Sequence, residues 1–315
     1  MELRNLGQTS LRVSAVGLGC NNFGRNVDRD TARAVVHKAL DMGVTLFDTG
    51  DTYGHRGGSE TIMGEVLGAR RKDIVLATKF GRPMDAEGKL QGGSRRYVMF
   101  AVEASLKRLK TDWIDLYQSH KPDPLTPIEE TLRALDDLVK QGKVRAIGTS
   151  HMPTAEVIDA ANTARTYGLT SVTSCEDEYS LLARGIERDL LPTMQANGIS
   201  LLPFYPLASG LLTGKYKRGT PLPEGSRFAV VKERNYIGQF LTEANWQKLD
   251  ALTAFAQTRG LTILDVAMSW IAARPQVASV IAGATKPGQV EANVKAAAAK
   301  LTAADMAELD RMTRD

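Results

Sequence analysis

Short apolar, β-branched runs alternate with amphipathic helical patterns along nearly the whole chain, and this alternation constrains the fold more than any other feature. Most of the runs are apolar at successive positions, which is typical of strands buried on both faces of a parallel sheet. Eight runs are predicted as strands, at residues 16–19, 45–49, 74–80, 114–120, 144–150, 171–176, 200–205 and 279–283. The chain is therefore predicted to be an α/β protein.

The segments between these strands carry apolar residues at helical spacing, most clearly at residues 31–42, 98–109 and 127–141. Five of the predicted helices end at a glycine, which is a common helix stop signal. These glycines are Gly43, Gly68, Gly142, Gly168 and Gly198. Strand and helix thus alternate in the regular order that a parallel barrel needs.

Eight strand–helix units favour a (β/α)8 TIM barrel with the helices outside. The alternative is a doubly wound open sheet, which would carry a GxGxxG fingerprint after its first strand. Here Gly17 and Gly19 are followed only by Gly24, which is the wrong spacing. The barrel is the preferred interpretation.

Two segments do not fit the repeating unit. Residues 3–14 precede the first strand and predict an N-terminal β-hairpin around residues 7–10, in a position to plug the bottom of the barrel. Residues 206–239 form a long, loop-like stretch at the C-terminal rim, and loops of this length are usually functional. No linker divides the chain, so residues 1–315 are expected to form a single domain.

Composition excludes several functional classes. The chain has 40 Lys and Arg against 36 Asp and Glu, and its basic clusters are short, so nucleic acid is not an expected partner. It has two cysteines, no run that could span a membrane and no apolar core of a signal peptide. No metal-binding spacing is present. We expect a cytoplasmic monomer or weak homo-oligomer that acts on a small molecule, without a metal.

Four polar residues, Asp48, Tyr53, Lys79 and His120, lie at or just after the carboxyl ends of predicted strands, where barrel enzymes place their chemistry. Each alone is commonly structural. Together they suggest catalysis, because Lys79 at the end of a buried strand needs a counter-charge and Asp48 can supply it. A cation beside Tyr53 is expected to lower the pKa of its phenol. Tyr53 would then donate a proton to a carbonyl oxygen, which His120 polarises.

These residues occur in three phrases: residues 43–54 (GVTLFDTGDTYG), residues 77–79 (ATK) and residues 109–120 (LKTDWIDLYQSH). With Ser59-Glu60, they resemble the aldo-keto reductase family. The resemblance implies an eight-stranded barrel that binds NADPH in extended form and transfers hydride reversibly between the nicotinamide and an aldehyde, ketone or sugar. It also implies that the catalytic Asp, Tyr, Lys and His are the same four residues.

The resemblance further implies where NADP(H) binds. On the nicotinamide side it implies Ser150, His151, Glu176, Phe204 and Tyr205. Glu176 stands where the family usually has Gln, His151 where Asn is frequent and Tyr205 where Ser is frequent. An ionised Glu accepts hydrogen bonds but cannot donate them, so the grip on the carboxamide differs from the family pattern.

The remaining cofactor positions serve the phosphates and the adenosine. The resemblance implies Pro206, Leu207, Ser209, Lys215 and Arg227 on the phosphate side, and Gly283, Thr285, Lys286, Gln289 and Asn293 around the adenosine and its 2′-phosphate. A glycine followed by a helix N-terminus is a physical phosphate site. Lys286 and Arg227 favour NADPH over NADH, because a 2′-phosphate attracts cations.

The substrate walls are expected from the rim and the long loop, at Asn22, Phe23, Phe80 and Phe228. We therefore predict an NADPH-dependent reductase of aldehydes or ketones. Two alternatives remain open. One is a redox-sensing regulatory subunit that binds NADP(H) with little turnover, since some members of the family act as partners of a membrane channel. The other is a barrel hydrolase that uses Asp48 and His120.

Overall fold

The computed structural model describes residues 1–230 and 240–314. Eight parallel strands form one sheet in the order β10-β3-β4-β5-β6-β7-β8-β9. The strands are β3 Val16–Gly19, β4 Leu46–Asp48, β5 Val75–Phe80, β6 Ile114–Ser119, β7 Val144–Ser150, β8 Val172–Glu178, β9 Ser200–Phe204 and β10 Val280–Gly283. Leu201 on β9 donates to Gln276 O at 2.7 Å and accepts from Ala278 N at 3.0 Å, which joins the two edges. The predicted barrel is confirmed.

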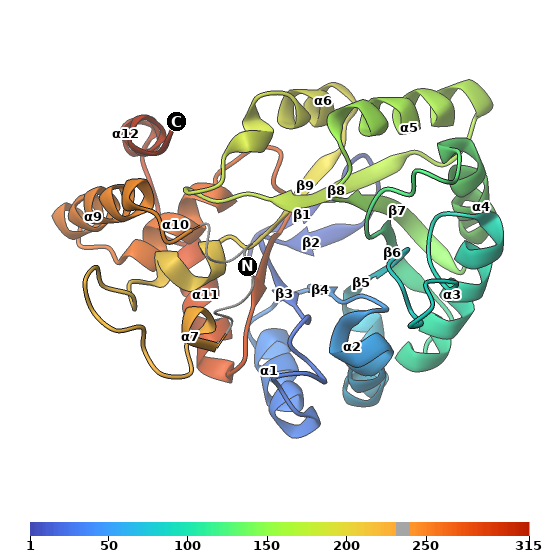
Figure 1. Cartoon of the computed structure of the whole chain (residues 1–315), viewed down its shortest axis with the longest axis horizontal. Coiled ribbons are helices and arrows are strands. Elements are labelled where there is room, and N and C mark those ends of the chain that lie inside the picture. The colour runs from blue at the N-terminus through green and yellow to red at the C-terminus, as the bar shows by residue number, and fades with distance from the viewer. Residues whose placement is uncertain (231–239, 315) are drawn as a thin grey trace.

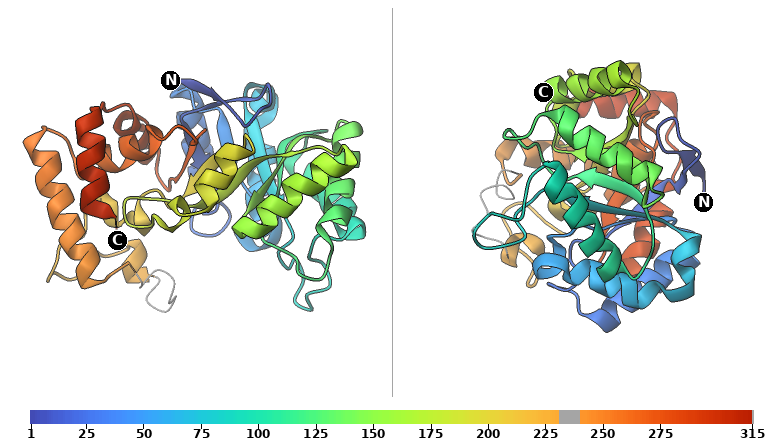
Figure 2. Two further views of the ribbon diagram at one scale, coloured as in Figure 1. Left: turned by 90° about the horizontal axis from the view of Figure 1, so that it is seen from above. Right: turned by 90° about the vertical axis from the view of Figure 1, so that its right-hand side faces the viewer.

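The helices lie outside the strands, as Figure 1 shows. Their apolar faces pack on the barrel because a strand buried on both sides needs a cover. They are α1 Arg29–Asp41, α2 Tyr53–Leu67, α3 Arg95–Leu109, α4 Ile128–Lys140, α5 Thr154–Tyr167, α6 Leu190–Ala196, α9 Glu243–Thr258, α10 Ile263–Ala272, α11 Pro287–Ala297 and α12 Ala303–Thr313. Figure 2 shows α9 and α12 side by side at the periphery, beyond the helices that touch the barrel. No helix among residues 1–230 and 240–314 is long and apolar enough to cross a membrane.

The N-terminal segment forms the predicted hairpin, with β1 Leu3–Asn5 pairing antiparallel to β2 Arg12–Ser14. Leu6 and Val13 are fully buried. They pack in one cluster with barrel-interior side chains such as Leu46, Leu116 and Leu202. The hairpin therefore closes the amino end of the barrel with apolar side chains.

The five glycines predicted as helix stops all have positive φ, from 47° at Gly68 to 76° at Gly43. This backbone region strains residues with a Cβ, so glycine ends each helix and lets the chain turn toward the next strand. The predicted long loop is partly ordered into short helices, η3 Ala208–Thr213 and α7 Arg227–Val230. Its residues 231–239 lie outside the described part of the chain.

Candidate active site

Lys79 and Asp48 form the ion pair that the sequence predicts. β4 and β5 are neighbours in the barrel, and each presents its carboxyl end to the same rim. The Lys79 side chain is fully buried, and its Nζ lies 2.6 Å from Asp48 Oδ1 and 2.7 Å from Asp48 Oδ2. Nζ also donates to Thr49 O at 3.1 Å. Burial alone would lower the pKa of Lys79, but the charges of Asp48 and then Glu176 outweigh it and hold that pKa above its usual value.

A second carboxylate reaches the same ammonium from another part of the barrel. Glu176 on β8 places Oε2 3.0 Å from Lys79 Nζ, and the same oxygen accepts from Gln118 Nε2 at 2.9 Å. Sequence reasoning assigned Glu176 to the cofactor and missed this contact with Lys79. The signal was available in the barrel geometry, because inward-facing residues of non-adjacent strands meet in one layer.

Gly148 leaves room for the side chains that contact Glu176 inside the barrel. Gly148 on β7 pairs with both Gln118 and Ser174. A Cβ at Gly148 would lie 2.6 Å from Ser174 Oγ and 3.0 Å from Gln118 Oε1. The missing side chain therefore lets Gln118 extend past β7 to Glu176.

Tyr53 is positioned by a tight turn at the start of α2. The next residue, Gly54, has φ +66°, and a Cβ there would lie 2.5 Å from Phe23 O, so only glycine fits. Lys79 Nζ lies 5.2 Å from the centroid of the Tyr53 ring. The ring of His120 meets Tyr53 edge-on, with centroids 5.4 Å apart. The structure thus brings the four predicted catalytic residues together at one mouth.

Lys79 acts to lower the pKa of Tyr53, as expected, but the net shift is upward. Burial is the largest cause and raises the pKa of Tyr53 above its usual value, and the negative charges of Asp48 and Glu176 add to it. The prediction counted the cation and left out the burial of the phenol and the second carboxylate. In this structure Tyr53 is held as the protonated phenol, which is the form that donates a proton.

His120 is neutral at ordinary pH. Its side chain is buried, and burial together with the charge of Lys79 holds the pKa of His120 well below its usual value. A neutral imidazole offers one N–H, which is suited to hydrogen bonding an oxygen rather than to carrying charge. This agrees with an orienting role rather than proton donation.

The residues expected on the nicotinamide side lie along the ends of β7, β8 and β9. Ser150 Oγ donates to Glu176 O at 3.0 Å, so its hydroxyl already has an internal partner. His151 packs on Phe204 with ring centroids 4.8 Å apart, and Tyr205 meets Phe204 edge-on at 5.2 Å. Phe204 is half-buried and leaves part of its ring open. A half-buried aromatic ring on the strand next to Glu176 fits a flat, partly polar ring.

The loop after β9 offers phosphate-binding groups. Pro206 and Leu207 lead into Ser209, which is buried, has φ 58°, and carries a hydroxyl without a hydrogen-bond partner among the described residues. A Cβ at the next residue, Gly210, would lie 3.1 Å from Lys215 Nζ, so the ammonium sits directly over this turn. A hydroxyl without a partner among the described residues, close to a cation, fits an anion.

Two more cofactor positions bracket this loop. Arg227 stacks on Tyr205 at 4.8 Å and donates from Nη2 to its hydroxyl at 3.0 Å. Beyond β10, the exposed Lys286 immediately precedes α11, whose first turn has no side-chain cap. Thr285 N donates to Gln289 Oε1 at 2.7 Å, which ties Gly283 and its neighbours to the helix start. β9 and β10 are neighbours in the closed barrel, so the segments that follow them begin side by side at the rim.

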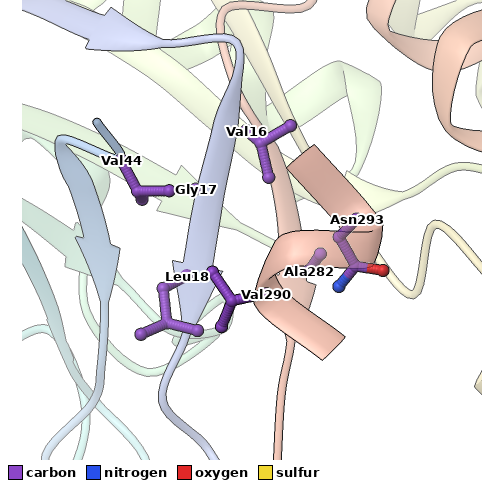
Figure 3. A pocket seen from close by; sticks show the side chains of 7 residues that line it. All are labelled: Val16, Gly17, Leu18, Val44, Ala282, Val290 and Asn293. Carbon is purple, nitrogen blue, oxygen red and sulfur yellow. The ribbon is translucent and has the colours of Figure 1, made fainter. Parts of the chain in front are cut away.

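Asn293 is placed differently from the other adenosine-side residues. It is 6% exposed and lines a cavity of about 10 Å³ between α11, β3 and β10 (Figure 3). Val16, Leu18, Val44 and Val290 form most of the wall. The space is about that of one water molecule, so this cavity is a packing gap and not a ligand site.

The predicted aromatic substrate wall needs correction. Phe23 and Phe80 are buried, and Phe80 packs on Tyr117 with centroids 4.8 Å apart. Phe228 is also buried and meets Tyr216 edge-on at 4.9 Å. These rings join the apolar core because packing removes more of their surface from water than an open wall would. Asn22 is the one of the four predicted residues that is partly exposed.

Comparison with known proteins adds a family match. The model of the Aldo/keto reductase family matches residues 15–314. A probable voltage-gated potassium channel subunit beta of Arabidopsis thaliana is 37% identical over 303 residues, covering 94% of this chain and 91% of that protein. A rice protein of the same name is 36% identical, with the same coverage. An L-glyceraldehyde 3-phosphate reductase of Escherichia coli (strain K12) is 35% identical over 303 residues, covering 94% of this chain and 87% of that protein.

Proposed function

The chain belongs to the aldo/keto reductase family, and we propose that it is an NADP(H)-dependent oxidoreductase that reduces aldehydes or ketones to alcohols. The carrying observation is the fully buried Lys79–Asp48 pair beside Tyr53 and His120 at one mouth of the barrel. A buried ammonium is costly unless opposite charges pair with it. Asp48 and Glu176 provide those charges, and the place of the pair beside Tyr53 supports a role for Lys79 in the reaction.

In the proposed reaction, Tyr53 donates its phenolic proton to the carbonyl oxygen of the substrate. Its raised pKa keeps that proton in place until the oxygen becomes basic. The Lys79 ammonium stabilises the phenolate that remains, and Asp48 keeps Lys79 charged and oriented. Neutral His120 orients the carbonyl oxygen by hydrogen bonding.

The cofactor supplies the hydride. We propose that Ser150, Glu176 and Phe204 hold its nicotinamide end and that the Ser209–Lys215 turn binds the pyrophosphate. Lys286 and Arg227 are proposed to favour NADPH, since a 2′-phosphate attracts cations. His151, Tyr205, Thr285 and Gln289 complete the proposed contacts, and Asn22 is the proposed substrate contact.

The test is NADPH oxidation against a panel of aldehydes, ketones and sugars, with alcohol oxidation by NADP+ in parallel. The panel should include small phosphorylated aldehydes, because the E. coli relative is named for one. Tyr53→Phe should lose at least about 100-fold in reduction while NADPH still binds. Tyr167→Phe is a matched control, because Tyr167 is 49% exposed on α5 and should change nothing. Near-normal turnover by Tyr53→Phe would contradict the proton-donor role.

A second candidate function is a redox-sensing regulatory subunit that binds NADP(H) with little turnover. The observation that favours it is the identity of 37% with a protein named as a potassium channel subunit beta, over 91% of that protein. Negligible steady-state turnover together with firm NADPH binding and a co-purifying partner would favour this function over the first.

A further inference from the structure

Two buried carboxylates share one ammonium at the mouth of the barrel. Asp48 and Glu176 come from β4 and β8, and both lie within 3.0 Å of Lys79 Nζ. Asp48 and Glu176 are each 3% exposed, and Lys79 is 0% exposed. We call these three residues the carboxylate–lysine triad. If every member were ionised, the triad would carry one net negative charge out of contact with water.

The surrounding groups do not balance that charge. The titratable side chains around the triad are Asp51 after β4, Tyr53 from α2, Arg82 after β5, His120 after β6, His151 after β7 and Cys20 after β3. Asp177 lies on the opposite face of β8, although the charge of Glu176 also acts on it. Desolvation and nearby cations hold the pKa of both histidines below the usual value. Arg82 acts on Tyr53 and the histidines, and it forms no ion pair with either carboxylate of the triad in the described structure.

Like charges so close cannot both persist in a dry site. Burial, followed by the negative charge of Glu176, raises the pKa of Asp48 well above its usual value. Both carboxylates contact the same ammonium, so a proton kept here would belong to the triad as a whole rather than to one oxygen.

The triad lies where the nicotinamide end of the cofactor is proposed to bind. Ser150 Oγ donates to the backbone oxygen of Glu176, and Phe204 lies on the neighbouring strand. The oxidised nicotinamide ring carries a positive charge, and the reduced ring is neutral. A positive charge close to the triad stabilises the ionised form of both carboxyl groups, so the carboxyl group that holds the proton releases it more readily.

We propose that the carboxylate–lysine triad is a proton-linked site that distinguishes the oxidised from the reduced nicotinamide, an inference that rests on the proposed function. The triad holds one proton when the barrel is empty or contains the reduced cofactor. It releases that proton to solvent when the oxidised cofactor binds. Charge balances in this step, because one positive ring enters as one proton leaves. NADP+ therefore binds more tightly as pH rises, and NADPH does not.

The experiment measures the affinities of NADP+ and NADPH for the purified protein by titration calorimetry from pH 6 to pH 9. The ratio of the two affinities cancels the titration of the 2′-phosphate, which both nucleotides carry. Linkage to one proton predicts that the ratio shifts toward NADP+ by up to about tenfold per pH unit within the titration range. Calorimetry in two buffers of different ionisation enthalpy should show release of about one proton with NADP+ and none with NADPH.

Glu176→Gln is the decisive variant, because it removes one charge while keeping the shape of the side chain. Asp48 then balances Lys79 alone, so the ratio should become independent of pH. Asp177→Asn is the matched control. It removes the neighbouring buried carboxylate, which strand alternation places on the opposite face of β8. The control should keep the wild-type dependence.

The proposal is overturned if the ratio of the NADP+ and NADPH affinities of the wild type does not change with pH. It is also overturned if the pH dependence of that ratio persists in Glu176→Gln or disappears in Asp177→Asn. The buffer-dependent proton release of the wild type tests it even if Glu176→Gln does not fold. If the protein reduces aldehydes but the ratio of its NADP+ and NADPH affinities does not change with pH, the proposed function stands and only this inference is lost. Failure of both nucleotides to bind at any pH would overturn both.

Discussion

At the amino end of the strands Asp115 lies between two guanidinium groups, whereas at the carboxyl end Lys79 lies between two carboxylates. Asp115 Oδ2 is 2.8 Å from Arg71 Nη1, and its Oδ1 is 2.9 Å from Arg145 Nη1. The same carboxylate accepts from Leu76 N at 3.0 Å and from Trp113 Nε1 at 3.2 Å. Both clusters are built around one buried charge with two opposite charges beside it.

The clusters differ in where their surplus charge goes. The Arg145 side chain is 53% exposed, so water screens the surplus positive charge at the amino end. At the carboxyl end all three side chains are at most 4% exposed, so the surplus negative charge stays inside the protein. The first cluster links β5, β6 and β7 through Asp115, whereas the second keeps a negative charge at the rim where a ligand is proposed to bind. This matches the usual division of a barrel into a stabilising and a functional end.

Lys79→Met should have the largest effect, because it removes the cation of the carboxylate–lysine triad and so affects both stability and turnover. It leaves two buried carboxyl groups without a cation, which should lower the free energy of unfolding by about 3–5 kcal/mol. It also removes the charge that stabilises the Tyr53 phenolate, so reduction should fall at least about 100-fold. Urea unfolding and turnover with a reactive aldehyde measure the two effects. Unchanged turnover would show that the triad is only structural.

Asp115→Asn should damage stability alone. The buried Arg71 guanidinium would lose its counter-charge, so the free energy of unfolding should fall by about 3 kcal/mol. Because Asp115 belongs to the amino-end cluster, turnover per folded molecule should stay within about twofold of wild type, which is the scatter expected for sites that do not touch each other. A large loss of turnover per folded molecule would contradict the interpretation that the Asp115 cluster contributes to stability alone.

Asp48→Asn should cost less stability than Asp115→Asn, although both remove a buried carboxylate from a cation. Glu176 remains beside Lys79, so the charges still balance, and we expect a loss of about 1–2 kcal/mol, roughly one charged hydrogen bond. Denaturant midpoints of the two variants, measured side by side, make the comparison. A greater loss for Asp48→Asn would mean that Glu176 does not compensate.

Asp51→Asn should leave stability unchanged at low pH and change it only as pH rises. Burial and the charge of Glu60 raise the pKa of Asp51 to about 8. The folded state then binds more protons than the unfolded state between about pH 4 and pH 8, so this group lowers stability as pH rises through that window. The variant should match wild type at about pH 4, gain on it through this window and have its full advantage above pH 8. Thermal melts at the two ends of the window test the sign, and a gain at about pH 4 alone would refute it.

Much of the fold follows from local patterns in the sequence. The eight apolar runs predict strands that the structure reproduces within two residues at each end, because strands buried on both faces leave a strong signal. The Lys79–Asp48 pair was also predictable, since neighbouring parallel strands bring their carboxyl ends together. Both conclusions depend only on residues close in sequence or on adjacent strands.

The rest depended on contacts across the barrel. The approach of Glu176 to Lys79 requires the layer of inward-facing residues and the space left by Gly148, neither of which a linear pattern reports. The net rise in the pKa of Tyr53 comes first from burial, which a linear pattern does not report either, and the charge of Glu176 adds to it. Aromatic side chains near a rim are equally suited to a wall and to the core, so sequence could not show that Phe23 and Phe80 are buried.

The hairpin covers the amino end of the barrel and closes it with apolar side chains. Leu6 and Val13 line its floor without exposed surface, so water and protons exchange with the Lys79 ammonium through the opposite opening. A molecule that binds at the carboxyl end of the barrel would therefore cover its open side. While it is bound, the Lys79 ammonium and the carboxylates of Asp48 and Glu176 would be further removed from water.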